Sequence, residues 1–264
     1  MLLVLSPKKI ARFLSMLVLA IGVVGTGAAF VRQATLSWSH KGLAELAGKF
    51  VLDSELSFPA WYSSGTILAC SLLLAVIALA KRRARSPFAG HWAGLAIIFL
   101  LMSIDEMAAL HEMFIVPLRR HFGAQGIFHY GWVVPAFFFL AGFGIAYLRF
   151  VFRHLDAPTR HRFIAAGLIY VGAALGMELV EGPIDQRFGD QSVPAQAAIA
   201  VEETLEMLGI VVFLFALLSY IAEHIGEIRL RVRQEVPSIR TCAGDQVSGP
   251  FLDPVTSLPT HPPI

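Results

Sequence analysis

Four residues able to bind a metal ion or transfer a proton lie at the end of an apolar segment of this sequence. The segment ends in MSIDEMAALHEMF at residues 102–114, which contains Asp105, Glu106, His111 and Glu112. Charged side chains are rare in membrane-spanning helices, because each costs roughly 2.5–3.5 kcal/mol on insertion. Their presence in so apolar a segment therefore indicates a functional site.

Two further segments place pairs of glutamates three residues apart. They are ELVE at residues 178–181 and ETLE at residues 203–206, and Glu202 stands just before the second. Residues spaced by three or four lie on one face of a helix. Each pair is therefore predicted to project from one side of its helix.

These residues also fall at similar depths in the predicted spans. A helix rises by about 1.5 Å per residue, and the hydrocarbon core of a bilayer is about 30 Å thick. On that scale Asp105, His129, Glu178 and Glu206 all lie in the outer third of the membrane, on four different helices. We therefore expect the acids and histidines to meet in one layer.

The elements that must position them are membrane helices. The chain has 264 residues, of which 56% are hydrophobic, and the apolar residues fall in blocks of membrane-spanning length. We predict an all-α membrane protein, a bundle of six transmembrane helices within residues 1–234, followed by a disordered Pro-rich cytoplasmic tail at residues 235–264. The predicted spans are residues 12–31, 59–80, 88–110, 129–149, 163–182 and 200–222.

Basic residues fix the predicted orientation. They concentrate in every second connection, for example KRRAR at residues 81–85, which places both termini in the cytoplasm. We predict a multi-pass protein of the bacterial inner membrane, and the net charge of +2 gives no indication of nucleic acid binding.

The first span also has the pattern of a signal peptide, and that alternative stays open. Residues 40–54 are predicted to form a short amphipathic helix on the outer surface, or an ordered loop.

The negative charge of several carboxylates in one layer must be compensated by metal ions, by shared protons or by water. Oxygen ligands with one or two imidazoles favour Fe, Mn or Zn, and helical bundles build one-metal and two-metal sites from such residues. The predicted metal ligands are Asp105, His111, Glu112, His129, Glu178, Glu181, Glu203 and Glu206. Glu106 and Glu202 are predicted to contact these ligands without binding the metal themselves.

Other arrangements explain the same residues differently. A water-filled outer vestibule would leave Glu202 and Glu203 as acids at a helix start, where the helix dipole favours them. A haem needs two histidines that face each other inside the bundle, whereas His111 and His129 are expected to meet only at its outer edge. The intramembrane protease pattern that begins with two glutamates needs an arginine where this chain has Met207.

The leading functional prediction is a metal-dependent membrane enzyme, a hydrolase or an oxidase, acting on a lipid-like substrate from the outer leaflet. The alternatives are a cation or proton transporter that uses the same acids, and an accessory subunit of a membrane complex. The inner halves of the third to sixth spans are almost wholly apolar, which favours a site over a pathway.

SIDEMAALHE at residues 103–112 and EETLEMLG at residues 202–209, with HYGW at residues 129–132 between them, resemble motifs of an uncharacterised family of bacterial polytopic membrane proteins. The resemblance covers most of residues 88–222. It implies that the acidic residues belong to a recurring pattern, and it carries no known activity.

Overall fold

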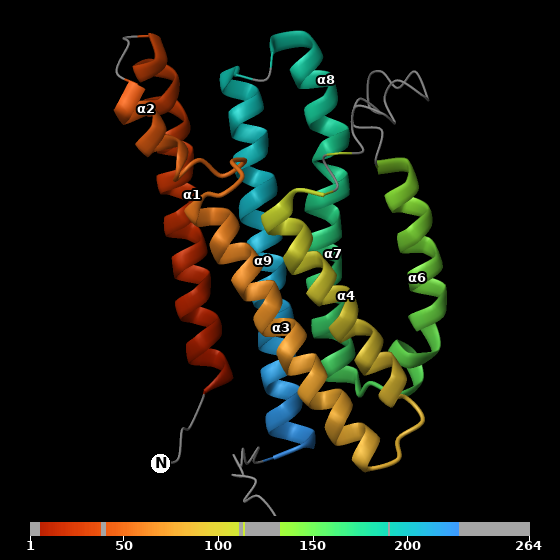
Figure 1. The fold of residues 1–264 in the computed structure, drawn as a ribbon. Helices are drawn as coiled ribbons and strands as arrows, with labels where there is room; N and C mark the ends of the chain where they lie inside the picture. Colours follow the sequence, from red (N-terminus) through yellow and green to blue (C-terminus); the bar gives the residue numbers. More distant parts are fainter. Residues whose placement is uncertain (1–5, 38–40, 111–112, 114–132, 190, 227–264) are drawn as a thin grey trace, which may run out of the picture. The chain divides into compact units, whose positions relative to one another are not determined.

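The structure, a computed structural model, describes residues 6–37, 41–110, 113, 133–189 and 191–226, and its helices belong to one compact unit, Met1–Ile228. Six helices in this part of the chain are long and apolar enough to cross a membrane, which confirms the predicted all-α fold class. The helices are α1 (Pro7–Ser37), α2 (Lys41–Gly48), α3 (Phe58–Arg83), α4 (Ala89–Ala108), α6 (Val133–Arg153), α7 (Ala157–Gly176), α8 (Glu178–Phe188) and α9 (Val193–His224) (Figure 1).

Three of these helices begin with the same local signal. Ser57, Asp156 and Ser192 each accept a hydrogen bond from the backbone N–H three residues later, at the start of α3, α7 and α9. A proline follows each capping residue at the second position. Such side chains satisfy helix N–H groups that have no partner inside the helix, and proline is tolerated there because it lacks that N–H. The sequence therefore fixes where these helices start.

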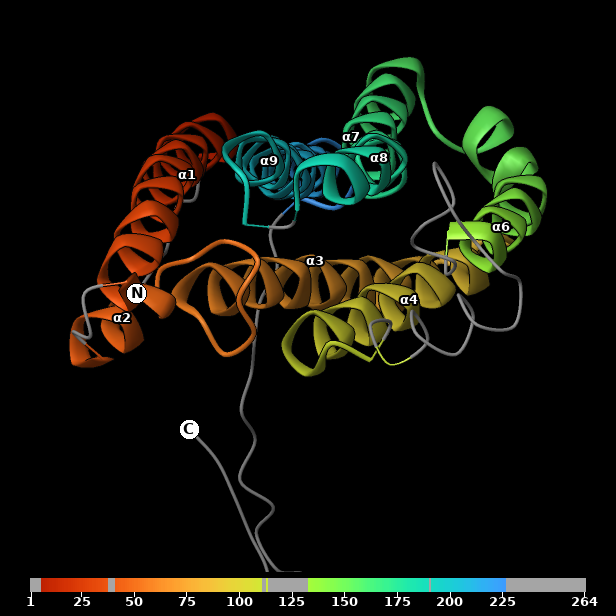
Figure 2. The same cartoon turned by 90° about the horizontal axis from the view of Figure 1, so that it is seen from above.

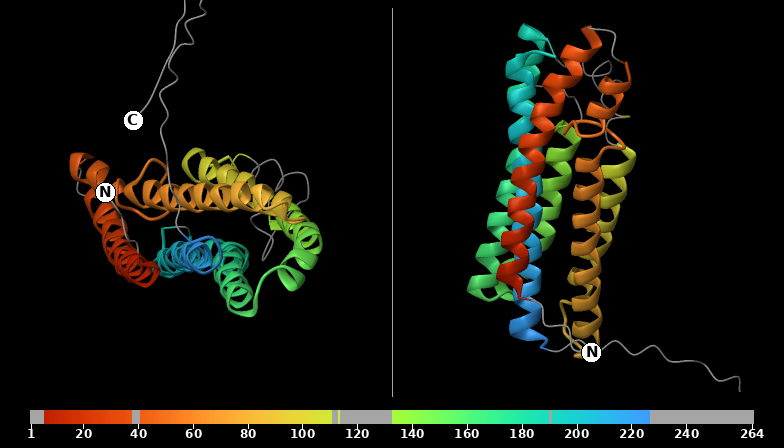
Figure 3. Two further views of the ribbon diagram at one scale, coloured as in Figure 1. Left: turned by 90° about the horizontal axis from the view of Figure 1, so that it is seen from below. Right: turned by 90° about the vertical axis from the view of Figure 1, so that its left-hand side faces the viewer.

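The helices pack in two rows. Seen from above, α1, α9 and α7 lie side by side, and α3 and α4 lie across from them (Figure 2). The view from below shows the same arrangement, with α6 beside α4 and α7 (Figure 3). α9 is the most buried spanning helix and α6 the least, with 61% and 6% of their spanning windows buried. The core is therefore built around α9, and α6 forms its loosest wall.

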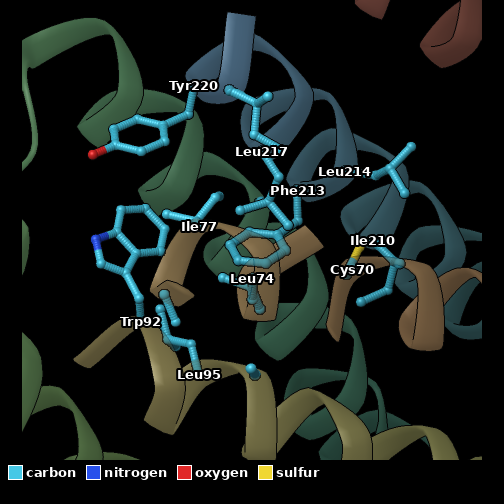
Figure 4. Close-up of a cluster of buried hydrophobic side chains, with 14 of the residues drawn as sticks. Cys70, Leu74, Ile77, Trp92, Leu95, Ile210, Phe213, Leu214, Leu217 and Tyr220 are labelled. Carbon is cyan, nitrogen blue, oxygen red and sulfur yellow. The ribbon is translucent and has the colours of Figure 1, made fainter. Parts of the chain in front are cut away.

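The core joins both rows through apolar side chains. Cys70, Leu74 and Ile77 of α3 and Leu217 of α9 are fully buried, as is Trp92 of α4 (Figure 4). Membrane helices associate through close packing, because lipid removes most of the hydrophobic driving force between them. These dispersion contacts hold α3, α4 and α9 in place.

Two helices extend beyond their predicted spans. The connection predicted at residues 183–199 is mostly helical, because α8 runs to Phe188 and α9 begins at Val193. In the predicted surface segment at residues 40–54, α2 ends at Gly48 and packs on α1. Its buried face contains Ala44 and Ala47, whereas Leu43 and Leu46 are exposed. The alanines, and not the leucines, therefore form its packing face.

Aromatic and polar side chains connect α4, α6, α7 and α9 at the end of the bundle where α4 and α7 begin. The Trp92 indole Nε1–H donates a hydrogen bond to Nε2 of His154 at 3.3 Å, and His91 stacks on Phe150. Tyr147 of α6 donates its hydroxyl to the carbonyl of His91 at 3.1 Å. These contacts attach the C-terminal end of α6 to α4.

We expect acid to weaken this attachment. Burial lowers the pKa of His154, which lies between the spanning segments of α6 and α7, from its ordinary value of 6.5; neighbouring Lys81, His91 and His224 lower it further. The unfolded chain then binds more protons than the folded one below about pH 6.5, so stability falls as the pH falls through this range. Asp156 also faces this region and pairs with His224 at 3.5 Å.

Thermal unfolding midpoints of wild type and His154→Gln, measured between about pH 8 and pH 5, test this expectation. Glutamine still offers Trp92 an acceptor but does not titrate, so its midpoint should depend less on pH. Equal pH dependence in the two proteins would assign the effect to other groups.

Candidate functional site

Carboxyl groups from four parts of the chain gather at the end of the bundle opposite His154. We call this set the acidic cluster, and it consists of Asp53, Asp105, Glu106, Glu178, Glu181, Glu202, Glu203 and Glu206. Glu203 interacts electrostatically with Glu206, Glu106, Asp53 and Glu181. The structure therefore brings acids of α4, α8 and α9 within electrostatic range of one another, together with one from the turn after α2.

Tyr170 of α7 lies among four of these acids. It interacts electrostatically with Glu206, Glu106, Glu203 and Asp105. Its position is set by Gly209 of α9, because a Cβ atom at Gly209 would lie 2.8 Å from the Tyr170 backbone nitrogen. Only glycine allows α7 and α9 to approach so closely at this point.

Glu181 and Glu202 share a hydrogen bond between their side chains. An ionised carboxylate can only accept hydrogen bonds, so such a pair must hold a proton. Glu181 is buried, with a relative exposure of 6%, and its Oε1 atom has no hydrogen-bond partner in the described part of the chain. Shared protons are one of the three forms of compensation that the sequence left open, and a hydrogen-bonded carboxyl pair is the arrangement that this form requires.

The position of the glutamates on α9 removes one explanation for them. Since α9 begins at Val193, Glu202 and Glu203 lie more than two turns inside the helix. The dipole at a helix start acts within the first turn, so it cannot account for these two acids. Glu178 and Glu181, by contrast, do occupy the first turn of α8.

The predicted metal centre is described only in part. Asp105, Glu178, Glu181, Glu203 and Glu206 lie in the acidic cluster together with Glu106 and Glu202, whereas His111, Glu112 and His129 lie outside the described residues. Within the described ranges, no three His, Cys, Asp or Glu side chains are placed so that they could hold a metal ion.

Sequence reasoning missed Asp53 and Tyr170. Asp53 belongs to a segment interpreted as a surface helix or an ordered loop, and nothing in its local pattern pointed toward the acids. Tyr170 was assigned to the apolar inner half of its span. The available signal was its hydroxyl group, since a lone tyrosine within an apolar span usually needs a hydrogen-bonding or polar neighbour.

An apolar cavity of about 370 Å³ adjoins the acidic cluster. Its walls come from α4, α6, α7 and α9, and they include Phe99, Phe139, Phe143, Phe163 and Phe213. Among the described residues that line it, Tyr147 and Tyr170 carry the only hydroxyl groups. The cavity has the size of a small-molecule site and a wall suited to hydrocarbon.

One face of α9 connects the cluster to the cavity. Glu202, Glu206, Gly209 and Phe213 follow one another at spacings of four, three and four residues, which keeps them on one face. The two glutamates belong to the acidic cluster, whereas Gly209 and Phe213 line the cavity. The polar and apolar parts therefore form one continuous site.

A family comparison covers the region that contains this site. A family model described as a domain of unknown function, DUF8692, matches residues 16–221. The chain belongs to this family. No curated protein and no solved structure matches the chain.

The DUF8692 match includes every residue of the acidic cluster and every residue that lines the cavity. It brings no activity with it, which agrees with the resemblance to an uncharacterised family. The six apolar helices place this DUF8692 protein among multi-pass membrane proteins. Any statement about its function must therefore come from the site.

Proposed function

We propose that this chain is an integral membrane protein that binds a lipid-like molecule, with its apolar part in the cavity and its polar end at the acidic cluster. One observation carries the proposal. Tyr170 lines the apolar cavity and also interacts with four carboxyl groups of the cluster. A molecule that fills the cavity up to Tyr170 therefore brings its far end to the acids.

The bilayer supplies such a ligand directly. α6, which forms one wall of the cavity, is the least buried spanning helix, and the exposed fractions of Phe137, Phe138 and Phe139 lie between 60% and 70%. A loosely packed wall beside lipid offers lateral access for an acyl or isoprenoid chain. The basic last turn of α3 lies at the opposite end of the bundle, so the positive-inside rule favours entry from the outer leaflet.

The carboxyl groups support acid–base chemistry on the bound molecule. A pair that shares one proton contains both a proton donor and a proton acceptor, which is the arrangement used by enzymes with paired carboxylates. Glu181 and Glu202 form such a pair. We therefore propose that the chain acts as an enzyme on the polar end of its lipid-like ligand.

That the enzyme uses a bound metal ion is a separate prediction. It rests on the predicted ligands His111, Glu112 and His129 as well as on the acidic cluster. If the metal centre exists, purified wild-type protein contains Fe, Mn or Zn in stoichiometric amount and a Glu178→Ala/Glu206→Ala double variant does not. Equal trace amounts in both proteins would exclude it.

Filling the cavity tests lipid binding. Gly167 lines the cavity, and a Cβ atom placed there meets no atom within 4 Å. We expect Gly167→Leu to fold normally but to occupy the ligand's space, and to lose most of the lipid that co-purifies with wild type. Mass spectrometry of lipids extracted from protein purified in a mild detergent measures the retained amount.

Gly172→Leu is the matched control. Gly172 lies on the same helix, is also open at its Cβ position and does not line the cavity. The substitution gains the same helix propensity and the same apolar surface. We expect it to retain the wild-type amount of lipid. Equal retention by all three proteins would contradict the proposed function.

A further inference from the structure

We infer that α6 is a gate of the cavity, and that protonation of His154, directly after the C-terminal end of α6, opens it. The inference rests on the proposed function for the molecule that passes the gate. Three observations carry it: a hydrogen bond that requires neutral His154, the attachment of α6 to the bundle, and the residues that this attachment shares with the cavity wall.

The hydrogen bond between Trp92 and His154 exists in only one protonation state of the histidine. The indole Nε1–H can donate but not accept, so Nε2 of His154 must be the acceptor, at 3.3 Å. A protonated histidine carries a hydrogen on both ring nitrogens. Two donors would then face each other, and the fully buried Trp92 would lose its partner. Acid therefore breaks this contact.

The surroundings of His154 oppose a positive charge on it. Burial lowers its pKa, and so do the neighbouring Lys81 of α3, His91 of α4 and His224 of α9. Asp156, the residue before α7, also faces this region, but it pairs with His224 at 3.5 Å. The closed arrangement therefore binds fewer protons than one in which His154 reaches water. A falling pH favours the open arrangement.

The contacts of α6 with the bundle are concentrated at this end. Among its described side chains only Phe150 is buried, and its ring centroid lies 5.1 Å from that of Trp92 and 5.4 Å from that of His91. Tyr147 adds the hydrogen bond to the carbonyl of His91. Toward the other end of the helix, the phenylalanines at residues 137–139 are exposed. Breaking the contact with Trp92 therefore releases α6 where its attachment is concentrated.

The attachment and the cavity share residues. Tyr147 and Phe150 contact α4, and both also line the cavity. Displacing this end of α6 therefore moves a wall of the cavity. Because α6 is the least buried spanning helix, the opening leads sideways into the bilayer. Exchange of the bound lipid-like molecule should then depend on the pH at this end of the bundle.

Distances between spin labels test the movement of α6. Leu148→Cys on α6 and Leu79→Cys on α3 introduce labelling sites at positions that are both 58% exposed. Cys242→Ser removes one native cysteine, and Cys70 stays unlabelled because it is fully buried. The full-length protein is measured in nanodiscs between about pH 8 and pH 5. We expect a second, longer distance to appear at low pH. His154→Gln should abolish it, because glutamine keeps an acceptor and does not titrate.

Release of a bound probe tests the gate. A fluorescent fatty alcohol, which does not titrate, is bound at about pH 8, and its release into empty vesicles is followed after a jump to about pH 5. We expect wild type to release it at least about fivefold faster at the lower pH, the factor that corresponds to losing the partner of one buried donor. His154→Gln should release it slowly at both pH values. His161→Gln removes an exposed histidine of α7 and should keep the wild-type response.

The outcomes distinguish this inference from the proposed function. If the fatty alcohol binds at neither pH, the proposed function fails and the gate fails with it. If it binds and acid accelerates its release equally from wild type and His154→Gln, lipid binding stands and the gate is wrong. Faster release without a change in the spin-label distance would mean that the molecule does not pass α6, which overturns the inference. Loss of the helical circular dichroism signal at pH 5 would overturn it too, because acid would then unfold the protein.

Discussion

Trp92→Ala should lower the free energy of unfolding by about 3–5 kcal/mol, which is typical of removing a fully buried tryptophan. The Trp92 side chain has no exposed surface and packs on Phe150, Phe163 and Tyr220, with ring centroids 4.8–5.9 Å away. It also donates the hydrogen bond to His154. One substitution therefore removes contacts between α4 and three other helices.

The effect should be strongest for α6. This helix has few buried residues, and its contacts with Trp92, through Phe150, lie near its C-terminal end. Hydrogen exchange of the purified variant should show α6 opening more often than α9. Phe138→Ala is the control on the same helix, because Phe138 is 70% exposed and should change stability by less than about 0.5 kcal/mol. Similar losses in the two variants would mean that Trp92 does not hold the bundle together.

The presence of six long apolar helices could be predicted from the sequence, because residues that face lipid must be apolar over the whole length of a span. The residues at which helices begin and end were harder to predict, because a helix can continue beyond the apolar segment that crosses the membrane. α9 shows this: its apolar window suggested a start at residue 200, whereas the cap at Ser192 and the proline after it mark the start at Val193. The capping signal was local and readable, and it changes the interpretation of Glu202 and Glu203.

The composition of the acidic cluster was predictable in part. Helical angles correctly placed Glu203 and Glu206 on one face, because that relation is fixed within a single helix. The presence of Asp53 depends on how the chain turns back after α2, which no periodicity encodes. The cavity depends on how loosely α6 packs on its neighbours, and this is a property of several helices together.

The closeness of α7 and α9 depends on a single glycine, and Gly209→Ala should disturb both stability and binding. The new Cβ atom would lie 2.8 Å from the backbone nitrogen of Tyr170 and 2.9 Å from its Cβ. Backbone atoms cannot move aside as a flexible side chain does, so the helices must separate. Overpacking of this kind typically costs about 1–3 kcal/mol.

The displacement would act on function because Tyr170 belongs to both parts of the site. Moving Tyr170 changes the end of the cavity and its distance to Glu206, so Gly209→Ala should also retain less lipid than wild type. Gly172→Ala has open space at its Cβ position and should gain up to about 1 kcal/mol of helix propensity without loss of lipid. Thermal unfolding and lipid quantification on the same preparations separate the two effects. A Gly209→Ala protein as stable as wild type, with its lipid retained, would show that the contact between α7 and α9 is not what positions Tyr170.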